Sequence, residues 1–374
     1  MYKVLFIRLS SIGDIVLTEP CVRLLKEHLP AVEIHYLTKP EYAEIIKSFP
    51  VTVDKIYELG SVHQTKSTIK SSTMKPPLHT ILQLRKEKYD CVIDLHNKFS
   101  TFVVLQLLAA KRKIVYRKQH LTRRLMVLKL TQKSIDSVVW SYLETLQKLL
   151  DSKIDWDRIK SGKQQYPRLQ PQKETQSRVY DTFTTYGINL KTTGNHLGSK
   201  VYKEQVLVGL FPGSQHFTKQ YPANRIVNFL LSVPAVWNCV FVIFGDWKDK
   251  GIALEIKSLS GLKIYDMTGV FGLHDLITAV SLLDIVVTND SGPMHIAAAL
   301  QKPQIAIFGA THTRLGFRPL NDNAVVLQGT AKCQPCSLHG GRACRLEHLN
   351  CFREIESSKV FTEFEKLYNQ IVEL

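Results

Sequence analysis

Short apolar runs alternate along the first half of the chain with segments that are apolar at helical spacing. The runs predict strands and the segments between them predict helices. Strands are expected at Val4–Leu9, Glu33–Leu37, Lys55–Glu58, Cys91–Leu95 and Ile114–Tyr116. Helices are expected after the first strand, at Phe99–Ala110 and at Val138–Leu150. This alternation favours a parallel sheet covered by helices.

The second half of the chain repeats the pattern. Its strands are expected at Gln205–Phe211, Val240–Phe244, Lys263–Asp266, Ile285–Thr288 and Gln304–Phe308. Its helices are expected at Asn224–Leu231, Asp249–Leu259, Leu273–Leu283, Met294–Leu300 and Ser358–Glu373. The predicted fold class is therefore α/β, with two Rossmann-like, doubly wound domains in tandem. Ligands of such domains bind at the carboxyl ends of the strands, which predicts an interdomain cleft.

A polar stretch at residues 151–204, with two prolines, interrupts the alternation and predicts a linker and the start of the second domain. The predicted domains are residues 1–175 and 176–355. A last helix at 356–374 would pack back on the N-terminal domain. Residues 61–77 are rich in Ser, Thr and Lys and contain no acid, so they are either a substrate loop or a disordered segment.

The composition is that of a globular protein with proper cores, because 44% of its 374 residues are hydrophobic. No apolar run is long enough to span a membrane. The opening residues 1–8 have only a short apolar run before a charge, which is typical of a first strand and not of a signal peptide. These features predict a cytoplasmic protein.

The basic charge is concentrated in the first half of the chain. Residues 1–200 contain 33 Lys and Arg against 18 Asp and Glu, a balance of +15, whereas the remainder has a balance of +1. Between Lys111 and Lys133, nine basic residues occur with no acid. The run is either a solvated helix face or a surface that attracts an anionic partner. Residues expected to contact that partner are Lys111, Arg112, Arg117, Arg123 and Arg124.

Leucines at helical spacing within the same run predict an amphipathic basic helix, which favours a membrane surface as the partner. A nucleic acid is not expected, because no aromatic residues are interleaved with the charges and no known nucleic-acid module is visible.

Two turns between a strand and a helix predict a phosphate site. In one, Gly213 and Ser214 follow an apolar strand, and Lys219 comes shortly after them. In the other, Ser291 and Gly292 open a helix after a strand. Backbone amides and a helix dipole hold phosphate at such turns, and a lysine can neutralise a leaving diphosphate. The pair predicts a clamp for a nucleotide or nucleotide-sugar.

Asp14 stands where the first strand ends, next to Gly13. Its carboxylate can take the proton of an attacking hydroxyl, or it can cap the following helix. Gly13 would allow the backbone to approach a ligand closely.

Four further residues follow the strand ends of the second half. Asp249 is a candidate for ribose hydroxyls, and Asp290 would either contact ribose or order its loop. His295 would reach the ligand or pack in the core. Leu273 would contact the base or pack equally well in the core.

No His-Glu-x-x-His or Walker-type pattern is present, so neither a catalytic metal nor a cofactor is expected. Four cysteines lie close together near the C-terminus: Cys333, Cys336, Cys344 and Cys351. They are structural metal ligands, buried thiols or a redox pair, and their spacing does not match a standard zinc finger.

Three segments, residues 7–20, 213–222 and 288–299, resemble those of the lipopolysaccharide heptosyltransferases of glycosyltransferase family nine. The resemblance implies a GT-B fold and an inverting, metal-independent transfer of heptose from ADP-heptose. The acceptor would be an anionic, lipid-linked inner-core oligosaccharide, reached by a cytoplasmic enzyme peripheral to the inner membrane. A different nucleotide-sugar, a glycan acceptor other than lipopolysaccharide, and a non-catalytic nucleotide-sugar-binding protein stay open.

The resemblance also implies roles for individual residues. Asp14 matches the family's general base, and Lys219 matches its diphosphate-binding lysine. The residues Asp290, Ser291 and Gly292 match its phosphate-binding turn. Asp249 lies near its ribose-binding acid and Leu273 near its adenine wall. Tyr221 replaces the usual tryptophan of the lysine motif and keeps an aromatic ring.

Overall fold

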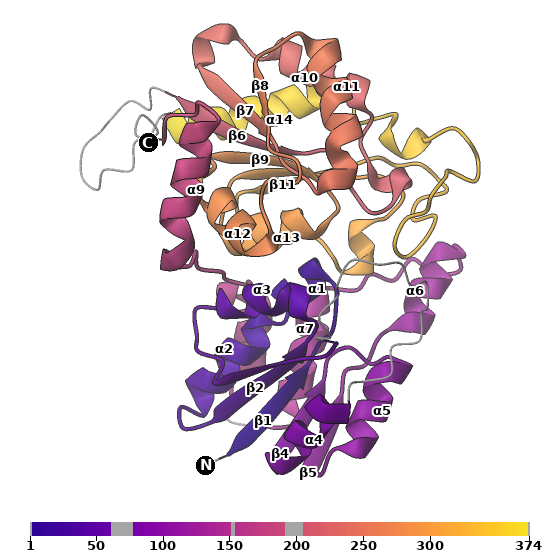
Figure 1. Cartoon of the computed structure of the whole chain (residues 1–374). Helices are drawn as coiled ribbons and strands as arrows, with labels where there is room; N and C mark the ends of the chain where they lie inside the picture. Colours follow the sequence, from indigo (N-terminus) through magenta and orange to yellow (C-terminus); the bar gives the residue numbers. More distant parts are fainter. Residues whose placement is uncertain (1, 61–77, 151–153, 191–204, 373–374) are drawn as a thin grey trace. The chain divides into compact units, whose positions relative to one another are not determined.

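The computed structural model describes residues 2–60, 78–150, 154–190 and 205–372, which form two compact units (Figure 1). Unit 1 comprises residues 1–119 and 137–169, and unit 2 comprises residues 120–136 and 170–374. Residues 61–77, predicted as either a substrate loop or a disordered segment, and residues 191–204 of the predicted linker lie outside the described residues.

Unit 1 is built on a parallel five-stranded sheet with the order β3-β2-β1-β4-β5. Its strands are β1 (Lys3–Ile7), β2 (Glu33–Thr38), β3 (Lys55–Glu58), β4 (Tyr89–Asp94) and β5 (Ala110–Val115). Ile7 pairs with Leu37 on one side and with Asp94 on the other. The strands therefore end level with one another, and the residues that follow them share one edge of the sheet.

Helices cover the sheet of unit 1. They are α1 (Ile12–Val16), α2 (Glu19–His28), α3 (Ala43–Lys47), α4 (Leu78–Lys86), α5 (Phe99–Leu107), α7 (Val138–Gln147) and α8 (Trp156–Ser161). Buried side chains of the central strand, such as Leu5 and Ile7, pack with Val104 and Leu105 of α5. The apolar strand residues thus supply the core that the sequence pattern predicted.

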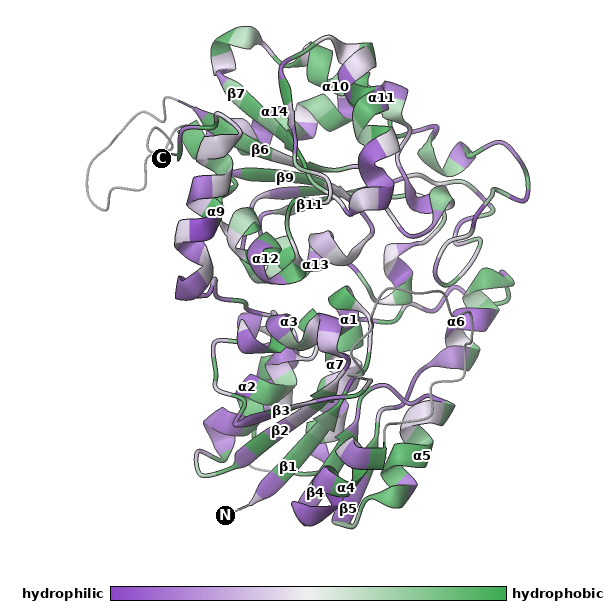
Figure 2. Cartoon of the chain, in the orientation of Figure 1, coloured by the Kyte–Doolittle hydropathy of each residue, from purple (hydrophilic) through white to green (hydrophobic). Residues whose placement is uncertain are grey.

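Unit 2 contains a parallel six-stranded sheet with the order β11-β10-β9-β6-β7-β8. Its strands are β6 (Val206–Phe211), β7 (Cys239–Ile243), β8 (Ile264–Asp266), β9 (Ile285–Asn289), β10 (Gln304–Phe308) and β11 (Ala324–Gln328). The central strands β6 and β9 are buried along their whole length and are mostly hydrophobic (Figure 2). Both faces of the sheet are covered, as parallel sheets require.

The helices of unit 2 include the last one of the chain. They are α6 (His120–Val127), α9 (Lys173–Thr185), α10 (Ala223–Ser232), α11 (Lys250–Ser260), α12 (Leu273–Leu282), α13 (Gly292–Ala299) and α14 (Ser357–Val372). The ring centroid of Phe364 in α14 lies 5.2 Å from that of Phe229 in α10. Tyr368 stacks on Trp237 at 4.2 Å. The last helix therefore packs in the core of unit 2, and its packing on the N-terminal domain stays a prediction.

Residues 120–136 belong to the N-terminal half of the sequence but pack in unit 2. Met126 and Ile135 are buried there against Leu315. The predicted basic helix is confirmed as α6, but Arg123 is buried and its Nε donates to the Leu315 carbonyl at 3.3 Å. The basic run is thus divided between the two units.

Other differences arise where sequence periodicity is weak. The strand predicted at Ile114–Tyr116 begins at Ala110, because the edge strand β5 carries exposed Lys and Arg that hide its pattern. The predicted linker contains α8 and α9, and the short edge strand β11 was not predicted. No helix among the described residues is long and apolar enough to cross a membrane.

Candidate active site

Asp14 lies just beyond the carboxyl end of β1, in the short helix α1. Its Oδ2 accepts from Arg8 Nη2 at 2.7 Å and from Ser11 Oγ at 3.0 Å. Its Oδ1 accepts only a long hydrogen bond, 3.4 Å, from the Tyr142 hydroxyl. Asp14 also accepts from the Ser11 backbone amide at 3.3 Å, so Ser11 is the N-cap residue of α1 and Asp14 lies inside its first turn. The role of Asp14 as a general base stays a prediction. One oxygen is fixed, and the other is less engaged.

Charge decides the protonation state of Asp14. Burial alone would raise the pKa of its carboxyl, but the adjacent Arg8 guanidinium and the Ser11 hydrogen bonds outweigh burial and lower it. Arg8 is itself held by two further bonds, from Nε to the Ser10 carbonyl at 2.7 Å and from Nη1 to the Leu95 carbonyl at 2.6 Å. Asp14 is therefore ionised and held in place at neutral pH.

Further basic groups follow the ends of β4 and β5. Burial, followed by the charges of Arg8 and Lys98, lowers the pKa of His96 to about 3, so this ring is neutral. Its Nδ1 is buried and has no hydrogen-bond partner within the described part of the chain. Burial and the same charges lower the pKa of Lys118 to about 8. Together these five residues, Arg8, Asp14, His96, Lys98 and Lys118, are called the carboxyl-edge cluster.

His96 and Lys98 were missed, because the expected acceptor contacts were chosen from the dense basic run between Lys111 and Lys133. Lys118 lies within that run but was not singled out. A usable signal was their position, because His96 and Lys98 follow β4 and Lys118 follows β5, and both strands end at the same sheet edge as β1.

The basic residues that were predicted to contact an anionic partner are dispersed. Lys111 and Arg112 lie in the amino half of β5, where Lys111 Nζ pairs with Asp90 at 2.7 Å. That is the sheet edge opposite to Asp14. Arg117 follows β5 and is exposed, as is Arg124 on α6 of unit 2. Arg123 is buried, and its guanidinium lies 5.1 Å from the centroid of the Phe317 ring.

In unit 2, Lys219 and Asp290 come from the two turns that the sequence singled out. Lys219 Nζ lies 2.8 Å from Asp290 Oδ2, and the same oxygen accepts from Thr311 Oγ1 at 2.6 Å. Lys219 ends the short 3-10 helix η4 (Phe217–Lys219), and Asp290 directly follows β9. Both side chains are mostly buried, at 14% and 9% exposed, so their charges act with little screening by water.

Asn289 joins the two turns. Its Nδ2 donates to the Pro212 carbonyl at 2.7 Å, and its Oδ1 accepts from the Tyr221 amide at 3.1 Å. The next residues, Ser291 and Gly292, cap and open α13. The turn that carries Ser214 and the amino end of α13 therefore belong to one connected arrangement, in which Lys219 is the cation.

Asp249 is adjacent to the first turn. A Cβ placed on Gly213 would lie 2.1 Å from Asp249 Oδ1, and one on Gly245 would lie 2.5 Å from its Oδ2. At both positions an added Cβ would displace the Asp249 side chain, because the carboxylate lies directly against the backbone. Leu273 begins α12 and is half-buried, and His295 is buried within α13. Gly13 is buried in α1 of unit 1, and its proposed contact with the donor stays a prediction.

The cysteine-rich segment packs against Lys219. The amide of Gly341 donates to Thr218 Oγ1 at 2.8 Å, and the Thr218 amide donates to the Gly341 carbonyl at 3.1 Å. A Cβ on Gly340 would lie 2.9 Å from Lys219 Cδ. The segment thus supports the residue that carries the cationic charge, a contact that sequence spacing could not reveal.

The cysteines of this segment, Cys333, Cys336, Cys344 and Cys351, are free thiols. Burial, with the neighbouring Cys333 thiol, raises the pKa of Cys336 to about 12. Among the described residues, no three cysteine sulfurs lie within 4.8 Å of one another, so the structure does not gather them as a set of metal ligands.

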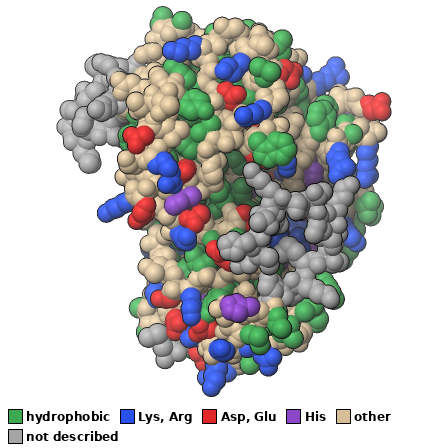
Figure 3. All heavy atoms as spheres, in the orientation of Figure 1, with side chains coloured by type: hydrophobic (Ala, Val, Ile, Leu, Met, Phe, Trp, Pro, Cys, Tyr) green, Lys and Arg blue, Asp and Glu red, His purple; other side chains and the backbone are tan. Residues whose placement is uncertain are grey.

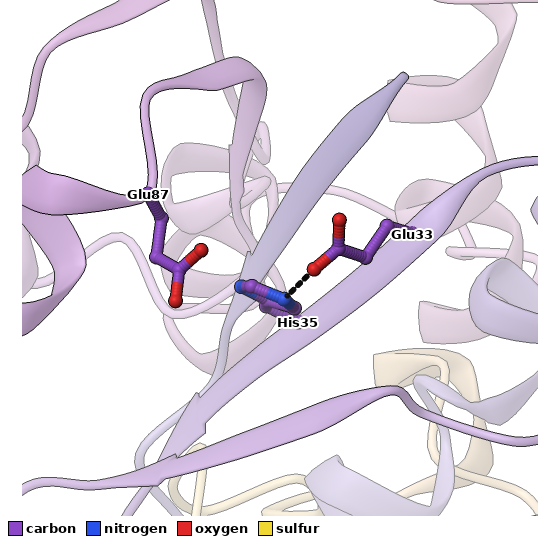
Figure 4. Close-up of side chains that lie close together, drawn as sticks. All are labelled: Glu33, His35 and Glu87. Atoms are coloured by element: carbon purple, nitrogen blue, oxygen red, sulfur yellow. Dashed lines mark hydrogen bonds and ion pairs between the residues drawn. The ribbon is translucent and has the colours of Figure 1, made fainter. Parts of the chain in front are cut away.

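Two glutamates and a histidine lie close together at the amino edge of the sheet in unit 1. Figure 4 shows Glu33, His35 and Glu87, with His35 Nε2 2.8 Å from Glu33 Oε1. Lys3 Nζ lies 2.7 Å from Glu87 Oε2 and 3.3 Å from Glu33 Oε2, and Lys55 Nζ lies 2.5 Å from Glu87 Oε1. The two ammonium groups balance the two carboxylates. The five residues Lys3, Glu33, His35, Lys55 and Glu87 are called the amino-edge network. Their charges are paired with one another, and the pairs connect the amino ends of four strands.

Residues 78–348 match the family model for glycosyltransferase family 9 (heptosyltransferase). The chain belongs to this family and is a glycosyltransferase. The resemblance inferred from the three sequence motifs is thereby confirmed.

Relatives and solved structures agree with this assignment. The chain is 25% identical over 337 residues to lipopolysaccharide heptosyltransferase 1 of Campylobacter coli, which covers 87% of this chain and 90% of the relative. It is similar in fold to an E. coli ADP-heptose LPS heptosyltransferase II, with a TM-score of 0.69, 20% identity, and 98% and 99% of the two chains covered.

A family 9 glycosyltransferase of Veillonella parvula gives a TM-score of 0.73 at 18% identity, with 99% of this chain and 98% of the other covered. The predicted α/β class, with the two Rossmann-like sheets of a GT-B fold, is confirmed.

Proposed function

We propose that this glycosyltransferase moves a heptose from ADP-heptose to an inner-core sugar of lipopolysaccharide. The observation that carries the proposal is the buried Lys219–Asp290 pair between two phosphate-type turns in a family 9 chain. The names of similar proteins, which include lipopolysaccharide and ADP-heptose, support the acceptor and the donor.

The donor half of the reaction is assigned to unit 2. Lys219 and the first amides of α13, at Ser291 and Gly292, would hold the diphosphate and stabilise the charge that grows on it. Because these groups supply the positive charge, the proposal needs no metal. The ion pair with Asp290 would hold the Lys219 ammonium in position, and the ammonium would also contact the bound diphosphate.

The nucleoside contacts are assigned to the surroundings of the same turns. Asp249 would accept from the ribose hydroxyls, and the backbone at Gly213 and Ser214 would approach the donor closely. Leu273 would contact the adenine. His295 is buried, so its proposed effect on the donor passes through the packing of α13.

The acceptor half is assigned to unit 1. Asp14 Oδ2 is occupied by Arg8 and Ser11, so Oδ1 is the oxygen that would accept the proton of the attacking hydroxyl. The hydroxyl oxygen forms a bond to the anomeric carbon as the bond from that carbon to the diphosphate breaks. The electron pair leaves with ADP, and attack opposite to ADP inverts the anomeric configuration.

The acceptor's negative charge is assigned to the carboxyl-edge cluster. Lys98 and Lys118 lie with Arg8 around Asp14, whereas Lys111 and Arg112 lie at the other end of their strand. We therefore move the proposed acceptor contacts toward Lys98, Lys118 and the exposed Arg117. The acceptor is lipid-linked in this proposal, and the enzyme would work at the surface of the inner membrane.

A panel of nucleotides tests the donor assignment. Melting temperatures of wild-type protein and of Lys219→Met would be measured with ADP, UDP, GDP and ADP-heptose at equal concentrations. Ligands that bind only the folded state raise the melting temperature. We expect ADP-heptose to give the largest shift in the wild type and a clearly smaller one in Lys219→Met. A preference for UDP or GDP would refute the donor, and no shift with any nucleotide would favour a different class of function.

Transfer itself is tested by mass spectrometry of an inner-core acceptor incubated with ADP-heptose. A product heavier by one heptose is expected. Binding of ADP-heptose with neither transfer nor release of ADP would instead support a non-catalytic nucleotide-sugar-binding protein.

A further inference from the structure

Helix α5 of unit 1 is apolar on both of its faces. Its inner face is buried through Thr101, Val104 and Leu105. Its outer face carries Phe99, which is 81% exposed, and Phe102, which is 53% exposed. A helix that is hydrophobic all round is normally covered on every side. Here the outer face has no covering element among the described residues, although Figure 2 colours much of the helix as hydrophobic.

The neighbouring helix α4, which contacts α5, extends the same surface. Leu78 and Leu82 of α4 are 71% and 46% exposed, and Leu107 near the end of α5 is 43% exposed. In Figure 3, hydrophobic side chains gather at the place that α5 takes in Figure 1. These five residues, Leu78, Leu82, Phe99, Phe102 and Leu107, are called the apolar face. Single exposed apolar residues are ordinary, but a contiguous group on two helices marks an interaction surface.

Basic side chains flank the apolar face. Lys98 directly precedes Phe99, and Arg85 and Lys86 end α4. All three are exposed. The nearby acids are already engaged, since Asp90 pairs with Lys111, and Glu87 pairs with Lys3 and Lys55. The surroundings of the face therefore carry an excess of positive charge.

We propose that the apolar face binds the surface of an anionic phospholipid bilayer. Phe99 and Phe102 would enter the interface between headgroups and acyl chains, and the flanking Lys and Arg would contact lipid phosphates. The inference rests on the proposed function, in which the acceptor is lipid-linked, and it adds the surface that would bring the enzyme to its acceptor.

Charge favours a bilayer over a second copy of the chain. An isologous dimer through the apolar face would bring the same basic groups of two copies toward each other. An anionic surface is complementary to both components of the face, the aromatic centre and the basic surround. A neutral partner would leave the positive charge unmatched.

Vesicle cosedimentation tests the proposal. Full-length protein would be mixed, without donor, with vesicles of phosphatidylcholine alone or of phosphatidylcholine with phosphatidylglycerol. The variant is the double substitution Phe99→Ser and Phe102→Ser. The control is Val236→Ser with Leu254→Ser in unit 2, where the side chains are 88% and 68% exposed. We expect binding only to the anionic vesicles, weakening as salt rises, and a loss of about 100-fold in the Phe variant alone.

Two results would overturn the proposal. One is equal binding of anionic vesicles by the wild type and the Phe variant. The other is a concentration-dependent dimer, seen by analytical ultracentrifugation, that only the Phe variant abolishes. Transfer to an acceptor stripped of its acyl chains is measured in parallel and should survive in the Phe variant. Vesicle binding by a protein that shows no transfer at all would support the apolar face and refute the proposed function.

Discussion

The sheet of unit 1 carries a group of charged residues at each end, and the two groups differ in how their charges are matched. The amino-edge network sets Lys3 and Lys55 against Glu33 and Glu87, so every charge has a partner of opposite sign. The carboxyl-edge cluster gathers several cations around Asp14, and one oxygen of that carboxylate is barely engaged. A network closed on itself stabilises strands, whereas unmatched charge at the carboxyl ends of parallel strands indicates a place for an anionic ligand.

Within the donor half, the largest effect is expected at Lys219. Lys219→Met removes the cation proposed to stabilise the leaving diphosphate, and we expect kcat/KM to fall on the order of 100- to 1,000-fold. Steady-state kinetics with ADP-heptose would measure the loss. The control is Lys366→Met, because Lys366 is an exposed partner of Glu363 in the same unit. Equal activity of both variants would remove Lys219 from the reaction.

A smaller loss of activity is expected from a substitution that moves Lys219 but keeps its charge. Gly340 has a φ of 92°, and an added Cβ would lie 2.8 Å from His216 Cβ and 2.9 Å from Lys219 Cδ. We expect Gly340→Ala to lower kcat/KM for the donor by about tenfold, by displacing the lysine.

The matched control is Gly187→Ala. Gly187 also has a positive φ, of 81°, but an added Cβ would meet nothing within 4 Å. It therefore carries the same backbone strain without the contact. If both substitutions lowered kcat/KM equally, backbone strain would explain the loss and the cysteine-rich segment would have no part in placing Lys219.

The carboxyl-edge cluster predicts a pH dependence of acceptor binding. Because burial and the charges of Arg8 and Lys98 lower the pKa of Lys118 to about 8, this side chain loses its charge as the pH rises through 8. The KM for an anionic acceptor should then rise a few-fold between about pH 7 and pH 9. Lys118→Gln should have a high KM at both pH values. A wild-type KM that is independent of pH would exclude Lys118 from the acceptor site.

The amino-edge network predicts a pH dependence of stability instead. Hydrogen bonds from Lys3, Lys55 and Tyr57 lower the pKa of Glu87 to about 2, from an ordinary value of 4.5. Its folded pKa is the lower one, so the stabilisation is complete above pH 4.5 and is lost as the pH falls toward 2.

We therefore expect Glu87→Gln to lower the free energy of unfolding by about 2 kcal/mol at pH 7, less than the full pKa shift implies because Lys55 is half-exposed. The difference from wild type should shrink as the pH falls below 4.5. Denaturant unfolding at several pH values measures it, and a difference that does not change with pH would contradict the account.

Much of the fold follows from the sequence, because strands of parallel sheets are buried on both faces and appear as plain apolar runs. The central strands β1, β4, β6 and β9 were all predicted near their observed bounds. The pattern failed at sheet edges, where β5 carries Lys111 and Arg112 and β11 is only half-buried. It also failed for residues 120–136, since neither periodicity nor charge indicates which unit a helix packs on.

The candidate site also contains residues that the sequence predicted and contacts that it did not. Asp14, Lys219 and Asp290 could be found because strand-end turns have characteristic small and polar residues. Arg8, which holds Asp14, lies inside a motif that gives no sign of the contact. The support of Lys219 by Gly340 joins residues more than a hundred positions apart, and local patterns do not contain such pairings.

The most direct test compares one carboxylate from each end of the sheet. Asp14→Asn and Glu87→Gln are nearly isosteric changes that remove one negative charge each. For both variants, kcat for heptose transfer and the free energy of unfolding would be measured together. We predict that Asp14→Asn lowers kcat on the order of 100- to 10,000-fold while ADP affinity stays unchanged, and that Glu87→Gln lowers stability while kcat stays near wild type. Wild-type turnover by Asp14→Asn would contradict the account.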